Sequence, residues 1–146
     1  MNFNMDQSLG FLLNKTALLS KAAFHQKLKE FDISPEQWAL IFRVVQKNGL
    51  TQKELSDSTY KDQANITRSV YRLEHKGILQ RVRNAKDKRI INIFPTPLAE
   101  EIVQKVIPLS SEHNKKLAKG LSKEEHQLLL DLLHKVEHNL ENGETK

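Results

Sequence analysis

One asparagine, one threonine and two arginines lie close together in one stretch of the chain, between Asp62 and Lys76. Arginine can donate two hydrogen bonds to the major-groove edge of guanine, and asparagine can pair in a similar two-bond manner with adenine. The methyl group of threonine can contact the methyl group of thymine. Asn65, Thr67 and Arg68 therefore predict a surface that reads base edges in the major groove of duplex DNA.

The stretch that carries these side chains has the pattern of an amphipathic helix. Ile66, Val70 and Leu73 fall within a narrow arc of the helical wheel and predict a buried face. The opposite side then carries Ala64, Asn65, Arg68, Tyr71 and Arg72. A polar face turned to solvent is the plain alternative to a DNA-reading face, and the neighbouring segments favour the DNA-reading interpretation.

A basic hairpin is predicted directly after this helix. Beyond Gly77, the segments 78–83 and 89–94 are rich in Ile, Val and Phe and too short for helices, so we expect two strands joined by the polar tip 84–88. Long cations on a narrow projection suit a minor groove or the phosphate backbone. The candidate DNA-binding residues of the helix and hairpin are Lys61, Gln63, Asn65, Thr67, Arg68, Arg72, Arg83, Lys86, Asp87, Lys88 and Arg89.

The elements that must position these residues follow from capping and periodicity. Capping boxes at Ser34–Gln37 and Thr51–Glu54 predict two helices before the basic one, and the second of these is short. A long amphipathic helix is expected over 8–30, another from 97 that Pro108 kinks or splits, and a last one after Gly120. A short helix, a tight break, a second helix and a hairpin make a winged helix-turn-helix arrangement. The predicted fold class is mainly α with a small β-hairpin wing and a helical dimerisation region.

Composition agrees with a protein that meets a polyanion. The chain has 146 residues, 23 basic and 18 acidic, for a net charge of +5. Residues 60–92 alone hold nine basic and three acidic side chains, so that segment carries +6 and the remainder −1. No apolar run approaches the roughly 18 residues of a membrane span, and no secretory signal pattern is present, which predicts a cytoplasmic protein with no membrane partner.

Catalytic and metal-binding patterns are absent from the sequence. The chain has no cysteine, which excludes thiolate nucleophiles, disulfides and iron–sulfur clusters, and it has no GxSxG, P-loop or HExxH motif. His134 and His138 have a chelating spacing of four, but they lie 140° and 180° from the apolar centre at Leu129 at about 100° per residue, which indicates solvent exposure. We therefore expect no enzyme activity, no catalytic residues, no cofactor and no metal.

The basic segment resembles the MarR family of bacterial transcription regulators. The resemblance rests on Asn65–Arg68, Arg72–Leu79 and Asp87–Arg89 with Ile93 and Thr96, and on the run from Gly120 to Leu140, which is similar to the family's C-terminal dimerisation helix. It implies a homodimer whose two winged-helix lobes read a pseudo-palindromic operator, often under control of a small-molecule effector. It also implies that Arg89 reaches DNA from the wing tip and that Asp87 orients basic side chains.

One departure from the family pattern is Pro95, which stands where leucine usually precedes the threonine. We expect the second strand of the hairpin to end one residue early there. Within a single domain 1–146, the helices of 8–33 and 97–142 are expected to dimerise, and 34–96 to form the DNA-binding lobe.

The predicted function is a sequence-specific, homodimeric transcriptional repressor released from duplex DNA by an effector. Phe24, Trp38 and Phe42 are candidates for lining a pocket for a small aromatic or apolar effector, although aromatic residues at helical spacing are more often plain core. The alternative is a winged-helix module that binds protein or RNA and has no effector response.

Overall fold

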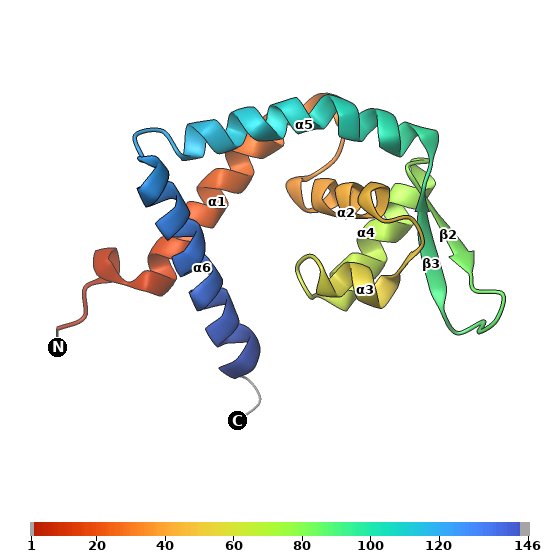
Figure 1. Ribbon diagram of the computed structural model, residues 1–146, viewed down its shortest axis with the longest axis horizontal. Helices are drawn as coiled ribbons and strands as arrows, with labels where there is room; N and C mark the ends of the chain where they lie inside the picture. Colours follow the sequence, from red (N-terminus) through yellow and green to blue (C-terminus); the bar gives the residue numbers. More distant parts are fainter. Residues whose placement is uncertain (1, 144–146) are drawn as a thin grey trace. The chain divides into compact units, whose positions relative to one another are not determined.

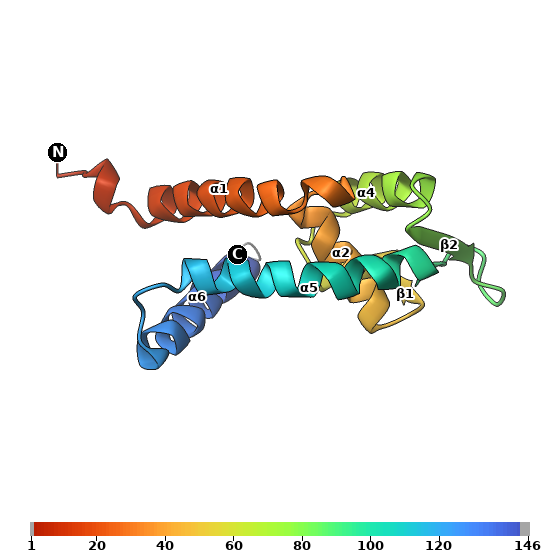
Figure 2. The same ribbon diagram turned by 90° about the horizontal axis from the view of Figure 1, so that it is seen from above.

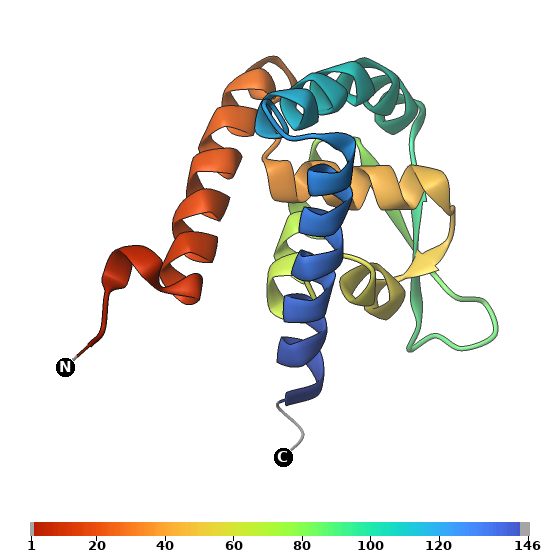
Figure 3. The ribbon, with the colours of Figure 1, turned by 60° about the vertical axis from the view of Figure 1, so that its left-hand side comes forward.

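The structure is a computed structural model that describes residues 2–143. The chain forms two compact units, with the boundary between Ser111 and Glu112. The helices of unit 1 are η1 (Met5–Gln7), α1 (Leu9–Lys27), η2 (Lys29–Phe31), α2 (Pro35–Gln46), α3 (Gln52–Asp57), α4 (Gln63–His75) and the larger part of α5 (Pro97–Leu117). Its strands are β1 (Leu50–Thr51), β2 (Leu79–Arg83) and β3 (Ile91–Pro95). Unit 2 contains the end of α5 and α6 (Lys123–Gly143), an uninterrupted helix in Figure 3.

The core of unit 1 lies where α2, α3 and α4 meet the sheet and the first half of α5 (Figure 1). The predicted buried face of the basic helix is confirmed, because Ile66, Val70 and Leu73 are at most 3% exposed. Burial of this face fixes the rotation of α4 about its axis, and the polar side chains on its other side therefore face solvent.

The helix starts that the sequence predicts are confirmed. Both capping boxes are complete: Ser34 and Gln37 cap α2, and Thr51 and Glu54 cap α3. Asp62 caps α4 by accepting the backbone N–H of Asn65 at 3.2 Å. These caps satisfy backbone N–H groups that have no partner inside the helix, so each of these three helices has a defined first residue.

The sheet has one strand more than the predicted hairpin. β3 is central, in the order β1-β3-β2, and both neighbours are antiparallel to it. β1 pairs only through Leu50 with Ile93 and Thr51 with Asn92. A two-residue strand has no detectable periodicity in sequence, which is why the prediction missed it. The wing is consequently anchored to the α2–α3 connection as well as to α4.

The prediction that the second strand of the hairpin ends before Pro95 is wrong. The strand, β3, includes Pro95, which is paired with Leu79. Thr96 donates its N–H to Ile78 on the β2 side, whereas the Ile93 carbonyl faces Gly49 on the β1 side. Because these directions alternate along a strand, the nitrogen of Pro95 points to the β1 side, where β1 no longer pairs. Proline therefore removes no hydrogen bond from the ladder.

Two predicted helices have different bounds in the structure. The helix expected over 8–30 ends as α1 at Lys27, because the Leu28 N–H is shared between the carbonyls of Phe24 and His25 and the chain tightens into η2. Pro108 does not split α5, which is continuous from Pro97 to Leu117. A proline removes a single N–H from the helix, and the bonds on either side maintain it.

Candidate nucleic-acid interface

The predicted DNA-binding residues lie on α4, on the loop before it and on the wing. In Figure 2 the β2–β3 loop projects beyond the helices of unit 1. Ten of the eleven candidates are exposed, and the eleventh, Asp87, is half-buried. The structure therefore brings two groups of polar side chains to the surface of one unit, from elements whose apolar sides share one core.

A chain of hydrogen bonds runs along the exposed face of α4. The Asp62 carboxylate accepts the side-chain amide of Asn65 at 2.6 Å, and the Asn65 oxygen accepts a guanidinium N–H of Arg68. Arg68 is thus oriented by a neutral amide, and its charge is not cancelled by direct contact with a carboxylate. An arginine oriented before binding loses less conformational entropy when it meets a guanine.

Thr67 connects α4 to the preceding helix. Its hydroxyl accepts a hydrogen bond from the Gln52 side chain at 2.6 Å and donates one to the Gln63 carbonyl at 2.8 Å. With the hydroxyl engaged on both sides, the methyl group is the part of Thr67 available to a base, as the predicted contact with a thymine methyl would require. Gln52 was missed by sequence analysis, since no pattern relates residues fifteen positions apart.

Asp87 and Arg89 form a two-bond ion pair at the wing tip. Arg89 Nε lies 3.1 Å from Asp87 Oδ1, and Arg89 Nη2 lies 3.1 Å from Oδ2. The Arg89 side chain is 90% exposed and that of Asp87 36%. These bonds to Arg89 lower the pKa of the Asp87 carboxyl, and the same contact raises the pKa of Arg89. The expected pairing of Asp87 with a nearby arginine is confirmed.

The loop that carries this pair is closed by further bonds. Arg83 donates to the Lys88 carbonyl at 2.8 Å, so one predicted DNA-binding cation also braces the loop. The Asn84 side-chain oxygen accepts the backbone N–H groups of Lys86 and Asp87 at 2.9 and 3.1 Å. Such bonds define the backbone of a polar turn in place of the strand ladder.

Arg81 is one of the nine basic residues of 60–92 but is not among the candidate DNA-binding residues. In the structure it contacts Glu74 and Tyr71. Its guanidinium lies 3.0 Å from the Glu74 carboxylate and 5.7 Å from the centre of the Tyr71 ring. His75 packs edge-on against the same ring at 4.5 Å between centroids. Arg81 therefore connects β2 to the end of α4, and it fixes Tyr71 on the exposed face of that helix.

Two of the three aromatic residues proposed for an effector pocket line a cavity of about 420 Å³. Trp38 and Phe42 lie there with their ring centroids 5.6 Å apart, beside Arg43 of α2 and Ile107, Ser110 and Ser111 of α5. Phe24, the third, belongs to the buried core and is 7% exposed. The cavity combines an apolar aromatic wall with one cation and two hydroxyl groups, which suits a flat ligand with a polar end.

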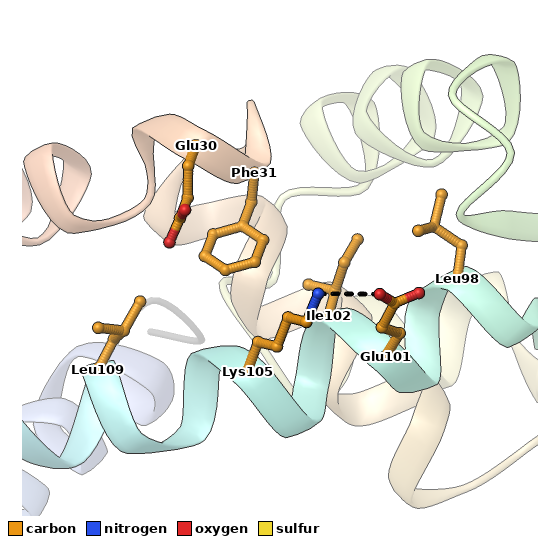
Figure 4. A pocket seen from close by; sticks show the side chains of 7 residues that line it. All are labelled: Glu30, Phe31, Leu98, Glu101, Ile102, Lys105 and Leu109. Atoms are coloured by element: carbon orange, nitrogen blue, oxygen red, sulfur yellow. Dashed lines mark hydrogen bonds and ion pairs between the residues drawn. The ribbon is translucent and has the colours of Figure 1, made fainter.

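A second pocket, of about 500 Å³, lies between η2 and α5 (Figure 4). Phe31 and Ile102 form its apolar part, and Glu30 of η2 also lines it. Lys105 is held 2.9 Å from Glu101, and the contact raises the pKa of Lys105. Because its ammonium is already paired, this pocket offers a ligand less free charge than the cavity beside Arg43.

Residues 2–143 contain no group of three or more His, Asp or Glu side chains arranged to hold a metal ion. His134 is exposed on α6, with Nδ1 3.7 Å from a Glu137 oxygen. Within the same part of the chain, no helix is long and apolar enough to cross a membrane.

Two helices that meet at a tight break, followed by a strand-built wing, define a winged helix-turn-helix protein. The MarR family model matches residues 33–91. HTH-type transcriptional regulator YybA of Bacillus subtilis (strain 168) is 29% identical over 119 residues, which cover 79% of this chain and 77% of that protein. Residues 33–91 of this chain are therefore similar to the MarR family of transcriptional regulators, and a helix-turn-helix regulator is similar to the chain over most of its length.

Solved structures share this fold over nearly the whole chain. Bordetella bronchiseptica BpsR, whose DNA binding is regulated by 6-hydroxynicotinic acid, matches 94% of this chain and 98% of its own with a TM-score of 0.88 at 19% identity. The Staphylococcus aureus MepR–DNA complex matches 92% of this chain and 98% of its own, with a TM-score of 0.82 and 25% identity.

Proposed function

We propose that this protein binds a specific duplex operator as a homodimer and represses transcription from it. The observation that carries the proposal is the pair of oriented arginines in unit 1: Arg68, directed by Asn65 on α4, and Arg89, directed by Asp87 on the wing. Exposed aromatic or aliphatic anchors would favour a protein partner, but Tyr71 on this face is engaged by Arg81 and His75. Asn65 and Arg68 offer groups that pair with base edges.

The two groups have different tasks in this proposal. Asn65, Thr67, Arg68 and Arg72 would meet base edges in the major groove, and Lys61 and Gln63 the phosphates at its rim. Arg83, Lys86, Lys88 and Arg89 would meet a minor groove or the backbone, where contacts depend little on sequence. MepR, 25% identical, has been solved as a complex with DNA, which supports the same use of this fold here.

The dimer is supported by apolar side chains that each unit leaves exposed near its chain end. Leu9, Leu18 and Leu19 of α1 are more than 60% exposed in unit 1. Unit 2 leaves exposed the α6 residues Leu128, Leu129, Leu130, Leu132, Leu133 and Leu140. So many large apolar side chains on two helices mark protein–protein contact surfaces. We assign dimerisation to 8–33 and 97–142 and DNA binding to 34–96.

An effector that relieves repression would enter the cavity beside Trp38 and Phe42. BpsR, similar in fold, has its DNA binding regulated by an aromatic acid. In this chain, Arg43 is the group that would receive an anionic end, and Ser110 and Ser111 could donate hydrogen bonds to it. A small aromatic or apolar molecule with one acidic group is therefore the proposed effector.

Selection from a random duplex library tests the proposal. The purified protein should enrich a pseudo-palindrome, and anisotropy titrations should show binding to it at least ~10³ times tighter than to a scrambled duplex. Sedimentation at micromolar concentration should show a dimer. No enrichment, or tighter binding to RNA hairpins than to any duplex, would support the alternative of an RNA- or protein-binding module.

A further inference from the structure

Two asparagines connect the wing tip to the helical core by side-chain bonds. Asn92 of β3 donates its amide to the Gly49 carbonyl at 2.8 Å. Asn84, the residue that follows β2, donates its own amide to the Asn92 oxygen at 3.1 Å. The Asn84 oxygen in turn accepts the N–H groups of Lys86 and Asp87. A series of bonds thus runs from the α2–β1 junction to the residue that directs Arg89.

The donor and acceptor assignment along this series is determined by its two ends. The Asn84 oxygen faces two backbone N–H groups, so its NH₂ group is the part that faces Asn92. Asn92 must then present its oxygen to Asn84, which leaves its own NH₂ group for the Gly49 carbonyl. Each group has one role that satisfies it, and reversal of any one amide would leave two donors or two acceptors in contact.

The inner end of the series is rigid. Gly49 has φ +84, a left-handed conformation that side chains disfavour, and an added Cβ would lie 3.3 Å from the Phe94 ring. Its N–H donates to the Ile93 carbonyl at 2.9 Å. Gly49 is thus tied to β3 through both its N–H and its carbonyl, and Asn92 binds to a fixed point of the core.

We propose that Asn92 and Asn84 are positioning residues that set the direction of the wing tip, and through Asp87 that of Arg89, for contact with DNA. The proposal rests on the proposed function and deepens it. Neither asparagine needs to touch DNA. Beyond the β2–β3 ladder, which ends at Arg83 and Ile91, two backbone bonds close the loop on itself: the Asn84 N–H donates to the Ile90 carbonyl at 2.9 Å, and the Ile90 N–H donates to the Asp87 carbonyl at 3.0 Å. The bonds from Asn84 to Asn92 and from Asn92 to Gly49 add a side-chain link from that loop to the core.

The first experiment compares Asn92→Leu with Asn48→Leu, the same replacement at an exposed position next to Gly49. Binding to a fluorescein-labelled 30-base-pair duplex of random sequence is measured by anisotropy at several salt concentrations. We expect Asn92→Leu to bind roughly two- to tenfold more weakly, the equivalent of one hydrogen bond, and its salt slope to fall by up to ~0.9 per chain. Asn48→Leu should match the wild type.

The second comparison removes one donor without removing the turn. Asn84→Asp retains an oxygen for Lys86 and Asp87 but has no amide to donate to Asn92, and Ala85→Asp adds the same charge to the same loop. We expect Asn84→Asp to bind the duplex more weakly than Ala85→Asp. Equal losses would overturn the proposal, because charge alone would then explain them.

Hydrogen exchange of the free protein separates this proposal from the proposed function. The Lys86 and Asp87 amides should exchange faster in Asn92→Leu, while the α4 amides and the melting temperature change little. Unchanged exchange at the wing overturns the positioning role, even where DNA binding falls. A wild-type protein that leaves every duplex unbound would contradict the proposed function, and the exchange result would still decide whether the asparagines hold the wing.

Discussion

The exposed face of α4 and the tip of the wing both orient an arginine, but with opposite electrostatic consequences. On α4, a neutral amide directs Arg68, and the carboxylate of Asp62 is one side chain further away. On the wing, a carboxylate bonds Arg89 directly through two nitrogens and lies against its charge. The orientation of Arg68 therefore leaves the positive electrostatic potential of α4 almost unchanged. The orientation of Arg89 by a carboxylate lowers the positive electrostatic potential at the wing tip. We infer that α4 is suited to selective pairing with base edges, and that the wing is suited to one contact with DNA at a defined position.

Loss of a buried side chain beneath α4 should have the largest effect. It would destabilise the fold that holds both Arg68 and Arg89 in place. Leu73→Ala deletes a fully buried side chain of α4 and should lower the free energy of unfolding by about 2–5 kcal/mol. Urea denaturation followed by circular dichroism measures this change. Leu98→Ala, at a position 42% exposed, is the control and should change stability by less than about 1 kcal/mol. Similar losses in the two variants would contradict the assigned core.

Next in size is the loss of selective pairing. Arg68→Ala should weaken binding to the selected operator by about 1–3 kcal/mol and binding to a scrambled duplex by much less. Asn65→Ala should follow the same pattern, since it removes both a pairing group and the group that directs Arg68. Anisotropy on the two duplexes provides the ratio. If both duplexes lose affinity equally, Arg68 contacts phosphate and α4 does not read sequence through it.

The wing cation should show a smaller and sequence-tolerant effect. Arg89→Ala is expected to weaken binding to operator and scrambled duplexes alike and to reduce the salt slope by ~0.9 per chain, because one phosphate contact is lost. Titrations at four or more salt concentrations measure the slope. Lys119→Ala, an exposed lysine in the α5–α6 connection of unit 2, is the control. Loss confined to the operator would mean that the wing, too, reads sequence.

Asp87→Ala tests whether the orientation of Arg89 by Asp87 matters more for DNA binding than the negative charge of Asp87. The substitution raises the net positive charge, and simple electrostatics expects tighter binding. We expect weaker binding, by less than in Arg89→Ala, because Arg89 then samples many rotamers. Glu100→Ala, at an exposed acidic residue of α5, changes the charge equally and should not weaken binding. Tighter binding by Asp87→Ala would show that the acid has no orienting role.

The smallest expected effect is in the titration of the wing pair. Because Arg89 lowers the pKa of Asp87, the carboxylate remains ionised at pH values where an ordinary aspartate begins to take up a proton, near ~3.9. The pair's contribution is complete above that ordinary pKa and is lost as the pH falls through the lowered one. The Asp87 carboxyl carbon, followed by NMR, should titrate lower in the wild type than in Arg89→Ala. The same midpoint in both would contradict the pair in solution.

Much of the structure of residues 34–96 could be predicted from sequence because its signals are local. The capping residues Ser34 and Thr51 lie three positions from their partners, and the buried arc of α4 repeats every three or four residues. The Asp87–Arg89 pair spans two positions. Such features follow from one helix turn or one loop, and no knowledge of the rest of the chain is needed.

The features that sequence analysis missed join distant residues. Asn92 and Gly49 are 43 positions apart, and Gln52 and Thr67 fifteen. Nothing in their types specifies each other as partners, and β1 is too short for a pattern. The end of β3 was predicted wrongly because proline is generally disfavoured within sheets. The sequence does not show to which side of the strand the nitrogen of Pro95 points.

The same proline has a consequence for behaviour at high concentration. β1 covers β3 only at Ile93 and Asn92, so the outer edge of the central strand beyond Ile93 is free of a partner strand within the described sheet. An uncovered edge with free N–H and carbonyl groups can recruit a strand from another molecule and begin aggregation. Pro95 has no N–H to offer at that edge. It therefore acts as a gatekeeper against unwanted strand addition, and it does so without weakening the pairing with β2.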